Sequence, residues 1–495
     1  MIILGFNIWD FFVIILYLLT ITSIGLYTVR KIKTVGDFVL GGRKFGKFFT
    51  TVRDFGLGTS TDEPVIVVGQ SYAIGLAGMW YSLINIVSTP FYWLIRPWLR
   101  RMRIYTMGDF CEMRFGSKYG YFYSFAGVLK STLQLGIVLK GAASVVAGIS
   151  GGILPVWAIV LVMAVLFILY GAAGGQYAGV ITDSFQVFFI IMLSFLLIPF
   201  CVVKAGGFTA ISNSLPKSFF QLVGHTGVSE MTGFFVLMAA IVNLNGSVGN
   251  PNAATVIGKT EWETRIGMVN GMILKRLCTV AWAFSGVFFA VVHPGIFNHD
   301  QVLGTAIASI FPVGLVGLMT GAMMVTAMSC CVGFMVIAGT YFMENFYKRI
   351  TPDKNEKHYL LVNRLASVGC ASLGVFFALV FPTLVDLLKY AWVVPSFVGM
   401  AIWGSLAWRR TNRYGAWATV IAMATIQAVC AYGFKLPFAV TAVIYLSIGY
   451  ISLITVSLLT PREPQERLDE FYALLHTPIG QEDRLKYARV KILHY

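Results

Sequence analysis

The sequence predicts an all-α integral membrane protein with about thirteen transmembrane helices in one membrane domain over residues 1–460, followed by a tail over residues 461–495. Hydrophobic residues make up 57% of the chain and charged residues 12%, and the mean hydropathy is +0.76. A soluble domain with so little charge would not cover its own surface. Apolar runs long enough to cross a bilayer, at about 20 residues each, recur from end to end.

The apolar runs give the expected membrane helices in order. The run from Leu303 is too long for one straight crossing, so its first part is expected at the membrane interface. The runs are Asn7–Val29, Gly46–Gly75, Leu76–Pro97, Tyr121–Ser150, Pro155–Ala173, Ala178–Lys204, Gly233–Val256, Gly267–Val292, Leu303–Phe342, Tyr359–Phe381, Leu384–Trp403, Tyr414–Val429 and Leu436–Leu459.

Lys and Arg residues gather in alternate loops, and this pattern orients the helices. They are frequent in residues 31–44, 100–118, 348–357, 409–413 and 462–491, whereas residues 206–231 and 293–301 contain almost none. Short loops rich in Lys and Arg mark the cytoplasmic side. The pattern predicts a multi-pass plasma-membrane protein with its N-terminus outside and its tail in the cytoplasm. The net charge of +15 is a sum over these loops, so it indicates neither a nucleic-acid partner nor a protein partner.

The second apolar run contains an acidic interruption. Its centre reads Gly56-Leu57-Gly58-Thr59-Ser60-Thr61-Asp62-Glu63-Pro64. Glycine and proline weaken the helix, and backbone freed at this depth is tolerated only where it is buried in protein or lines water. Because an acid within a membrane costs roughly 2.5–3.5 kcal/mol on insertion scales, such residues usually face a cavity or a pathway. The segment is therefore the best candidate for a binding site in the chain.

A second interruption follows five crossings later, between Ile241 and Asn252. It holds two glycines, a proline and the asparagines Asn243, Asn245, Asn250 and Asn252. Paired interrupted helices in corresponding halves are typical of secondary transporters with a site at the membrane midplane. The spacing predicts two five-helix repeats, helices 2–6 and 7–11, related by inversion, with helices 2 and 7 broken.

Motifs at four helices resemble the sodium:solute symporter family over nearly the whole chain. The matching segments are Asp37–Arg43, Ile104–Phe110 with Arg114–Gly116, Gly174-Gly175 with Ala178, Thr182, Asp183 and Gln186, and Thr326–Cys330. The resemblance implies the leucine-transporter fold with its inverted repeat and broken helices. It also implies alternating access, with sodium driving the uptake of a small polar organic solute across the lipid bilayer.

The resemblance places a sodium site where the first broken helix meets the ninth helix. It implies carbonyl ligands from Gly56, Thr59 and Thr326, side-chain ligands from Ser329 and Cys330, and a nearby acid, Asp183. Cys330 departs from the family pattern, which has a second hydroxyl there, and sulfur is a poor ligand for a hard cation. Coupling to protons, or transport independent of an ion, therefore stays open as the alternative.

On the solute side, the resemblance places Asp62 and Glu63 where relatives carry substrate-contacting or gating residues. The four asparagines of the second interruption are expected to face them. Hydroxyls and amides suit a polyhydroxylated or amide-bearing solute. Two carboxylates favour instead a cationic or amine-bearing solute unless they are neutralised internally, and a pair with Lys140 is one way to do so. Lys130, and Arg53 beside Asp54, are further candidate partners, and the last two are interpreted either as a local pair or as a cytoplasmic gate.

Other function classes have weaker support in the sequence. It shows no metal cluster, no nucleophile–base pair and no cofactor loop, so no enzyme activity is expected. A membrane sensor built on the same fold is a remaining alternative, but the tail is too short for an output domain. The identity of the solute and the oligomeric state are not indicated.

Overall fold

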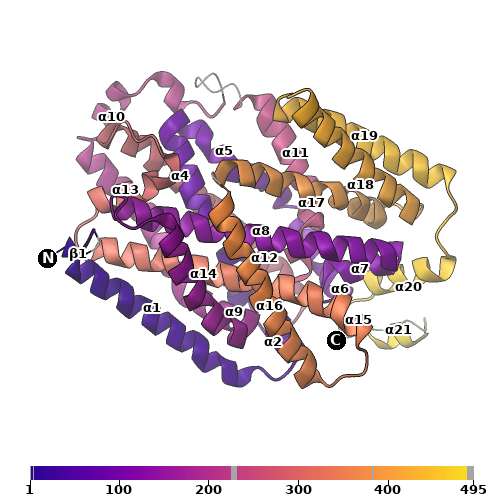
Figure 1. Cartoon of the computed structure of the whole chain (residues 1–495). Coiled ribbons are helices and arrows are strands. Elements are labelled where there is room, and N and C mark those ends of the chain that lie inside the picture. Colours follow the sequence, from indigo (N-terminus) through magenta and orange to yellow (C-terminus); the bar gives the residue numbers. More distant parts are fainter. Residues whose placement is uncertain (1, 4, 224–230, 382–383, 488–495) are drawn as a thin grey trace.

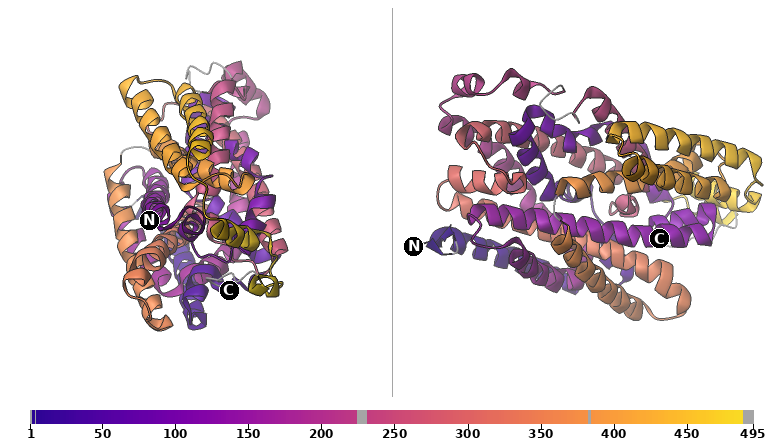
Figure 2. Two further views of the ribbon diagram at one scale, coloured as in Figure 1. Left: turned by 90° about the vertical axis from the view of Figure 1, so that its right-hand side faces the viewer. Right: turned by 45° about the horizontal axis from the view of Figure 1, so that its top comes forward.

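The computed structural model describes residues 2–3, 5–223, 231–381 and 384–487, so the last eight residues of the predicted tail lie outside the described part. Long helices lie side by side in one bundle, with the N-terminus and helix α20 at opposite ends (Figures 1 and 2). A short antiparallel pair, β1 (Ile2–Ile3) and β2 (Phe6–Asn7), precedes the first helix. The nearly all-helical architecture that the apolar runs predicted is confirmed.

Eight helices in the described ranges are long and apolar enough to cross a membrane, and three shorter apolar helices accompany them. The helices used below are α1 (Ile8–Thr28), α3 (Lys47–Gly58), α4 (Asp62–Ile74), α5 (Trp80–Leu83), α6 (Tyr92–Arg101), α7 (Met107–Phe115), α8 (Ser117–Ile149), α9 (Val156–Lys204), α10 (Phe208–Ser214), α11 (Gly233–Gly249), α12 (Glu261–Val292), α13 (Val302–Ile310), α14 (Leu315–Phe342), α16 (Glu356–Val380), α17 (Leu384–Ala407), α18 (Arg413–Ala428), α19 (Phe438–Leu459), α20 (Gln465–His476) and α21 (Asp483–Tyr487).

The two interrupted segments differ from each other. The first breaks between α3 and α4, where Thr59 takes a non-helical conformation at the end of α3. The second is narrower than expected, because α11 continues as regular helix through Asn243 and Asn245 to Gly249. Only then does Asn250 adopt an extended backbone, followed by the short 3₁₀ turn Pro251–Ala254.

Two further apolar runs are resolved into pieces, and one helix spans two of the expected runs. The run from Leu76 to Pro97 is not one helix but a succession of 3₁₀ turns, α5 and α6. The Leu303–Phe342 run divides into α13 and α14, as its length predicted. Gly175 interrupts α9 with φ 54° and ψ −150°, a conformation that favours glycine, and so divides it between the two crossings expected there.

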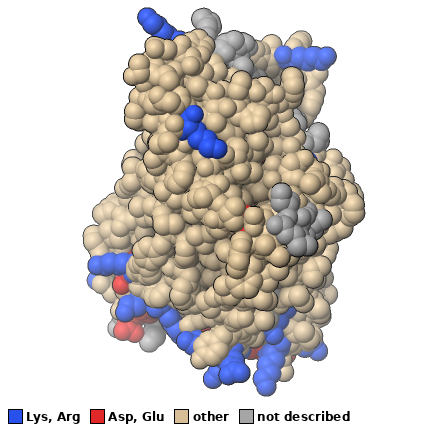
Figure 3. All heavy atoms as spheres, turned by 90° about the vertical axis from the view of Figure 1, so that its left-hand side faces the viewer, with Lys and Arg blue, Asp and Glu red and all other residues tan. Residues whose placement is uncertain are grey.

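Helices α8 and α14 form the buried centre of the bundle, while α1, α18 and α19 expose apolar side chains outward. Lys and Arg gather mainly at one end of the face in Figure 3, and uncharged side chains cover most of the remainder. This distribution is typical of a protein with a wide apolar belt that faces lipid.

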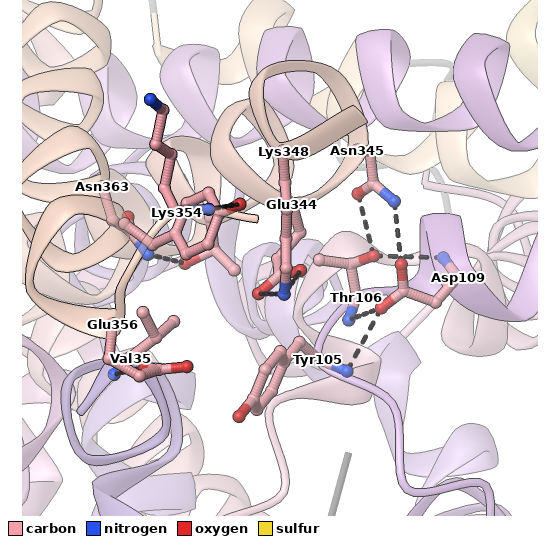
Figure 4. A network of polar contacts seen from close by, with 12 residues as sticks. Val35, Tyr105, Thr106, Asp109, Glu344, Asn345, Lys348, Lys354, Glu356 and Asn363 are labelled. Carbon is pink, nitrogen blue, oxygen red and sulfur yellow. Dashed lines mark hydrogen bonds and ion pairs between the residues drawn. The ribbon is translucent and has the colours of Figure 1, made fainter. Parts of the chain in front are cut away.

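A polar network joins the loop after the third expected crossing to the end of α14 (Figure 4). Asp109 accepts hydrogen bonds from the backbone N–H of Thr106 at 3.0 Å and from the Asn345 amide at 2.8 Å. Thr106 in turn donates to Asn345 at 3.0 Å. The motif at residues 104–110 therefore caps α7 and at the same time binds it to the π-helical turn Met343–Tyr347.

The described part of the tail packs across the same end of the bundle. Arg103, which is 1% exposed, pairs with Glu482 at 2.8 Å and donates to the carbonyl of Pro478. The Tyr472 hydroxyl donates to the carbonyl of Ser405 at 2.7 Å. The tail thus contacts both the end of α6 and the end of α17.

Close packing of α11 against α17 generates a prediction about stability. A methyl group at Gly399 would overlap the carbonyl oxygen of Asn245, which belongs to backbone and cannot move aside easily. We expect Gly399→Ala to lower the free energy of unfolding by about 1–3 kcal/mol, measured as a lower melting temperature in detergent.

The matched control is Gly369→Ala in α16, where nothing lies within 4 Å of the added methyl group. This substitution is expected to leave the melting temperature unchanged or to raise it, because alanine favours the helix. Equal melting temperatures for the two variants would show that the α11–α17 contact is not tight.

Candidate functional site

A polar cavity of about 210 Å³ lies between the two interruptions. The first interruption contributes Gly58, Ser60 and Glu63 to its wall, and the second contributes Asn250 and Asn252. The other polar wall residues are Asp54, Asn85, Tyr92, Arg96, Lys130, Gln134, Asn243, Ser247, Thr255, Lys275 and Arg276, and the apolar wall includes Phe334 and Trp392. The cavity thus brings together residues from both predicted repeats.

The predicted solute residues divide into two groups. Glu63, Asn243, Asn250 and Asn252 line the cavity. Asn245 is instead turned into the protein, where its amide donates to the carbonyl of Ile241 and its oxygen accepts from Tyr450 at 2.8 Å. Because successive helical residues point about 100° apart, the regular helix through 243–249 separates Asn243 from Asn245.

Asp62 is also outside the wall of the cavity. It is 1% exposed and lies against Gly141 of α8, so that a methyl group at Gly141 would be 2.9 Å from the Asp62 Cα. Of the two acids in the first interruption, Glu63 is the one that reaches the cavity.

Glu63 is paired with Lys275 of α12 at 2.9 Å, and this corrects the expected pair with Lys140. The Lys140 ammonium donates instead to the carbonyl of Phe381 and lines a separate cavity of about 850 Å³ beside Phe297 and Asp300. Lys275 carried a usable signal, because it is a lysine within the apolar run Gly267–Val292. Whether its ammonium reaches Glu63, however, depends on how α12 packs on α4.

A second ion pair forms one wall of the cavity. Asp54 accepts from Arg96 at 2.7 Å, and Arg96 also donates to the carbonyls of Ala253 at 3.2 Å and Thr255 at 3.3 Å. These contacts join α3, α6 and the segment after the second interruption. Arg53 and Asp54 therefore do not form a local pair, because each has its own partner.

The Arg53 side chain points the other way, into the protein. It donates to Asp183 of α9 at 2.6 Å and also to Gln176, and it is 2% exposed. Ser329 of α14 donates to the other Asp183 oxygen at 2.5 Å. Asp183 is therefore neutralised by an arginine and bound by one of the predicted ion ligands.

The predicted ion ligands meet where the first interruption packs on α14. The Cys330 thiol donates to the carbonyl of Gly56 at 3.2 Å. Thr59 and Thr326 both line a small cavity whose wall includes neither of those two residues. Gly56 lies in the last turn of α3, where carbonyls lack donors from their own helix. In contrast, Thr326 lies within the continuous helix α14. In the described part of the chain, no cluster of three His, Cys, Asp or Glu side chains forms a metal site.

Comparisons with known proteins show the family and the fold of the chain. The model of the sodium:solute symporter family matches residues 38–422. A sodium/pantothenate symporter from Haemophilus influenzae is 24% identical over 82% of the chain and 87% of its own length. A high-affinity proline transporter from Bacillus subtilis is 22% identical over 90% of the chain and 98% of its own length. The structure of a Na⁺-coupled sialic acid symporter in a substrate-bound outward-open state superposes with a TM-score of 0.80 at 17% identity, covering 93% of the chain and 99% of that protein.

The Glu63–Lys275 pair generates a prediction about coupled charges. Its side chains are 15% and 7% exposed, so removing one partner leaves a poorly solvated charge. We expect Glu63→Gln or Lys275→Met to lower the free energy of unfolding by about 2 kcal/mol or more. In a double-mutant cycle measured by thermal or chemical unfolding, the double variant is expected to lose clearly less free energy of unfolding than the two single variants lose together.

Lys140→Met serves as the control in the same cycle, because this lysine donates to the carbonyl of Phe381 and not to Glu63. Its effect is expected to add to that of Glu63→Gln without coupling. Coupling of Glu63 to Lys140 instead of Lys275 would contradict the arrangement described here.

Proposed function

The chain belongs to the sodium:solute symporter family and is a membrane transporter; from that premise we propose that it binds a small polar organic solute in the cavity beside Glu63 and couples its uptake to sodium entry. The solute and the ion cross the plasma membrane by alternating access. In this proposal the N-terminus faces outward and the tail faces the cytoplasm, as the loop charges favour.

The observation that carries the proposal is that the first interruption lies between α14 on one side and the polar cavity on the other. On one side, the Gly56 carbonyl and Thr59 face α14 beside Cys330 and Thr326. On the other side, Ser60 and Glu63 line the cavity. An ion bound on the first side would hold the interruption against α14, and so would set the shape of the cavity wall on the second side.

The oxygen atoms where the first interruption meets α14 suit sodium in their chemistry. A hard cation prefers oxygen ligands, which the Gly56, Thr59 and Thr326 carbonyls and the Ser329 hydroxyl would supply. Because Ser329 donates its proton to Asp183, its oxygen lone pairs remain available to a cation. Asp183 would act through Ser329, since Arg53 neutralises its charge.

The alternative is coupling to protons, and Cys330 is the observation that favours it. A sulfur atom, and not an oxygen, approaches the Gly56 carbonyl at 3.2 Å. The two alternatives differ in the ion on which folding stability and transport depend.

Cys330→Ser tests the ion site by replacing the sulfur with a better oxygen ligand. Because a ligand that binds the folded state stabilises it, the melting temperature should rise with sodium when sodium replaces choline at constant ionic strength. We expect Cys330→Ser to lower the sodium concentration that gives half of the rise in melting temperature by about threefold or more, which is ~0.7 kcal/mol of binding free energy. Ser329→Ala is expected to raise that concentration.

Cys331→Ser is the matched control. Its thiol points away from the interruption, toward the carbonyl of Leu135 at 3.8 Å, so its sodium dependence should equal that of the unmodified protein. A protein whose stability is indifferent to sodium, and whose transport in liposomes follows a pH gradient instead, would overturn sodium coupling in favour of proton coupling.

A further inference from the structure

We infer that the solute is an organic anion, and that Lys130 and Arg276 are the residues that attract and pair with its negative group. The inference rests on the proposed role of the cavity as the solute site and specifies the chemical class of that solute. It reverses the expectation from the two neighbouring acids alone, which favoured a cationic or amine-bearing solute.

The charges in the cavity wall do not balance. Four basic residues, Arg96, Lys130, Lys275 and Arg276, line it together with two acids, Asp54 and Glu63. Both acids are used internally, because Asp54 pairs with Arg96 and Glu63 pairs with Lys275. Among the described residues, Lys130 and Arg276 therefore form no ion pair at contact distance, although the charges of Asp62 and Glu63 act on them from farther away.

The first of these, Lys130 on α8, is 9% exposed. Its ammonium donates to the amide oxygen of Gln134 at 2.6 Å, which is a neutral partner. Both side chains line the cavity. The sequence offered Lys130 as a candidate partner for Asp62 or Glu63, whereas in the structure its ammonium lies beside Gln134 in the wall of the cavity.

The second, Arg276 on α12, is 6% exposed. One of its terminal nitrogens donates to the carbonyl of Ser82 at 3.3 Å, while its Nε has no hydrogen-bond partner. A buried guanidinium with an unused donor beside a polar cavity is suited to an incoming acceptor. Carboxylates fit this role, because arginine binds them through parallel hydrogen bonds.

Asp62 does not cancel the imbalance. It lies behind the wall and not in it, at 1% exposure against α8. Even when its charge is counted with those of Asp54 and Glu63, the four basic residues exceed the three acids by one. Partly desolvated charges interact more strongly than charges in water, so a cavity with this excess attracts anions and disfavours cations.

The remaining wall describes the neutral part of the solute. Asn243, Asn250 and Asn252 present amides, which can donate to and accept from hydroxyl or amide groups. Trp392 adds an apolar surface. The cavity therefore suits a small carboxylate that also carries hydroxyl or amide groups.

Charged thiol reagents measure the sign of the cavity potential without knowledge of the solute. We introduce Asn243→Cys in the cavity wall, and Ser212→Cys on the exposed face of α10 as the control. Each purified protein reacts at low ionic strength with 2-sulfonatoethyl methanethiosulfonate, an anion, and with the 2-(trimethylammonium)ethyl analogue, a cation. Intact mass follows the added group, and the parent protein corrects for its native cysteines, of which all but Cys370 are buried.

The anion-to-cation rate ratio at Asn243→Cys should exceed the ratio at Ser212→Cys by roughly tenfold or more. Adding Lys130→Gln or Arg276→Gln should bring it back toward the control. If one of these variants does not fold, the other tests whether removing a basic residue lowers the ratio. The ratio in Asn243→Cys alone gives the sign of the cavity potential. A ratio equal to the control, or one that favours the cation, overturns the inference.

The assay contains no sodium gradient, so its outcome is separate from that of the sodium titration. A positive cavity in a protein indifferent to sodium would retain the anionic solute and reject sodium coupling. A neutral or negative cavity in a sodium-dependent protein would reject the anionic solute and retain sodium coupling.

Discussion

The break in the first interrupted helix is the constraint on which the site depends. Within a membrane, freed backbone must be bonded by protein or must line water, because lipid offers no partners. Between α3 and α4 the surrounding helices meet this requirement: Cys330 contacts the Gly56 carbonyl, and the Thr61 hydroxyl donates to the carbonyl of Met323 at 3.0 Å. Both contacts come from α14, so the position of the break is tied to that helix.

Three ion pairs hold the broken helix in three directions. Arg53 binds Asp183 of α9, Asp54 binds Arg96 of α6, and Glu63 binds Lys275 of α12. Each pair removes the cost of an isolated charge in the membrane by joining two helices. Any movement of the broken helix that opens the cavity must therefore loosen at least one of these pairs, or carry the partner helix with it.

Much of the architecture could be predicted because it follows from local chemistry. Hydropathy locates the long helices, and glycine, proline and acidic residues in an apolar run locate the first break. Even so, the second break was expected over 241–252 and begins only at Asn250, since α11 tolerates Asn243 and Asn245 within its regular helix. Composition indicates that a segment is unusual, whereas the helix ends only where Pro251 disfavours a helical backbone at the preceding residue, Asn250.

The helical membrane class, the approximate helix positions, the two interrupted segments and their polar residues could all be inferred from the order of the residues alone. These features depend on the chain's own hydropathy and backbone preferences. The partners of the charges depend on how the helices pack: Lys275 and not Lys140 for Glu63, Arg96 for Asp54, and Arg53 for Asp183. An ion pair depends on the distance between side chains that lie more than a hundred residues apart in two of these cases, and that distance exists only once the helices have packed.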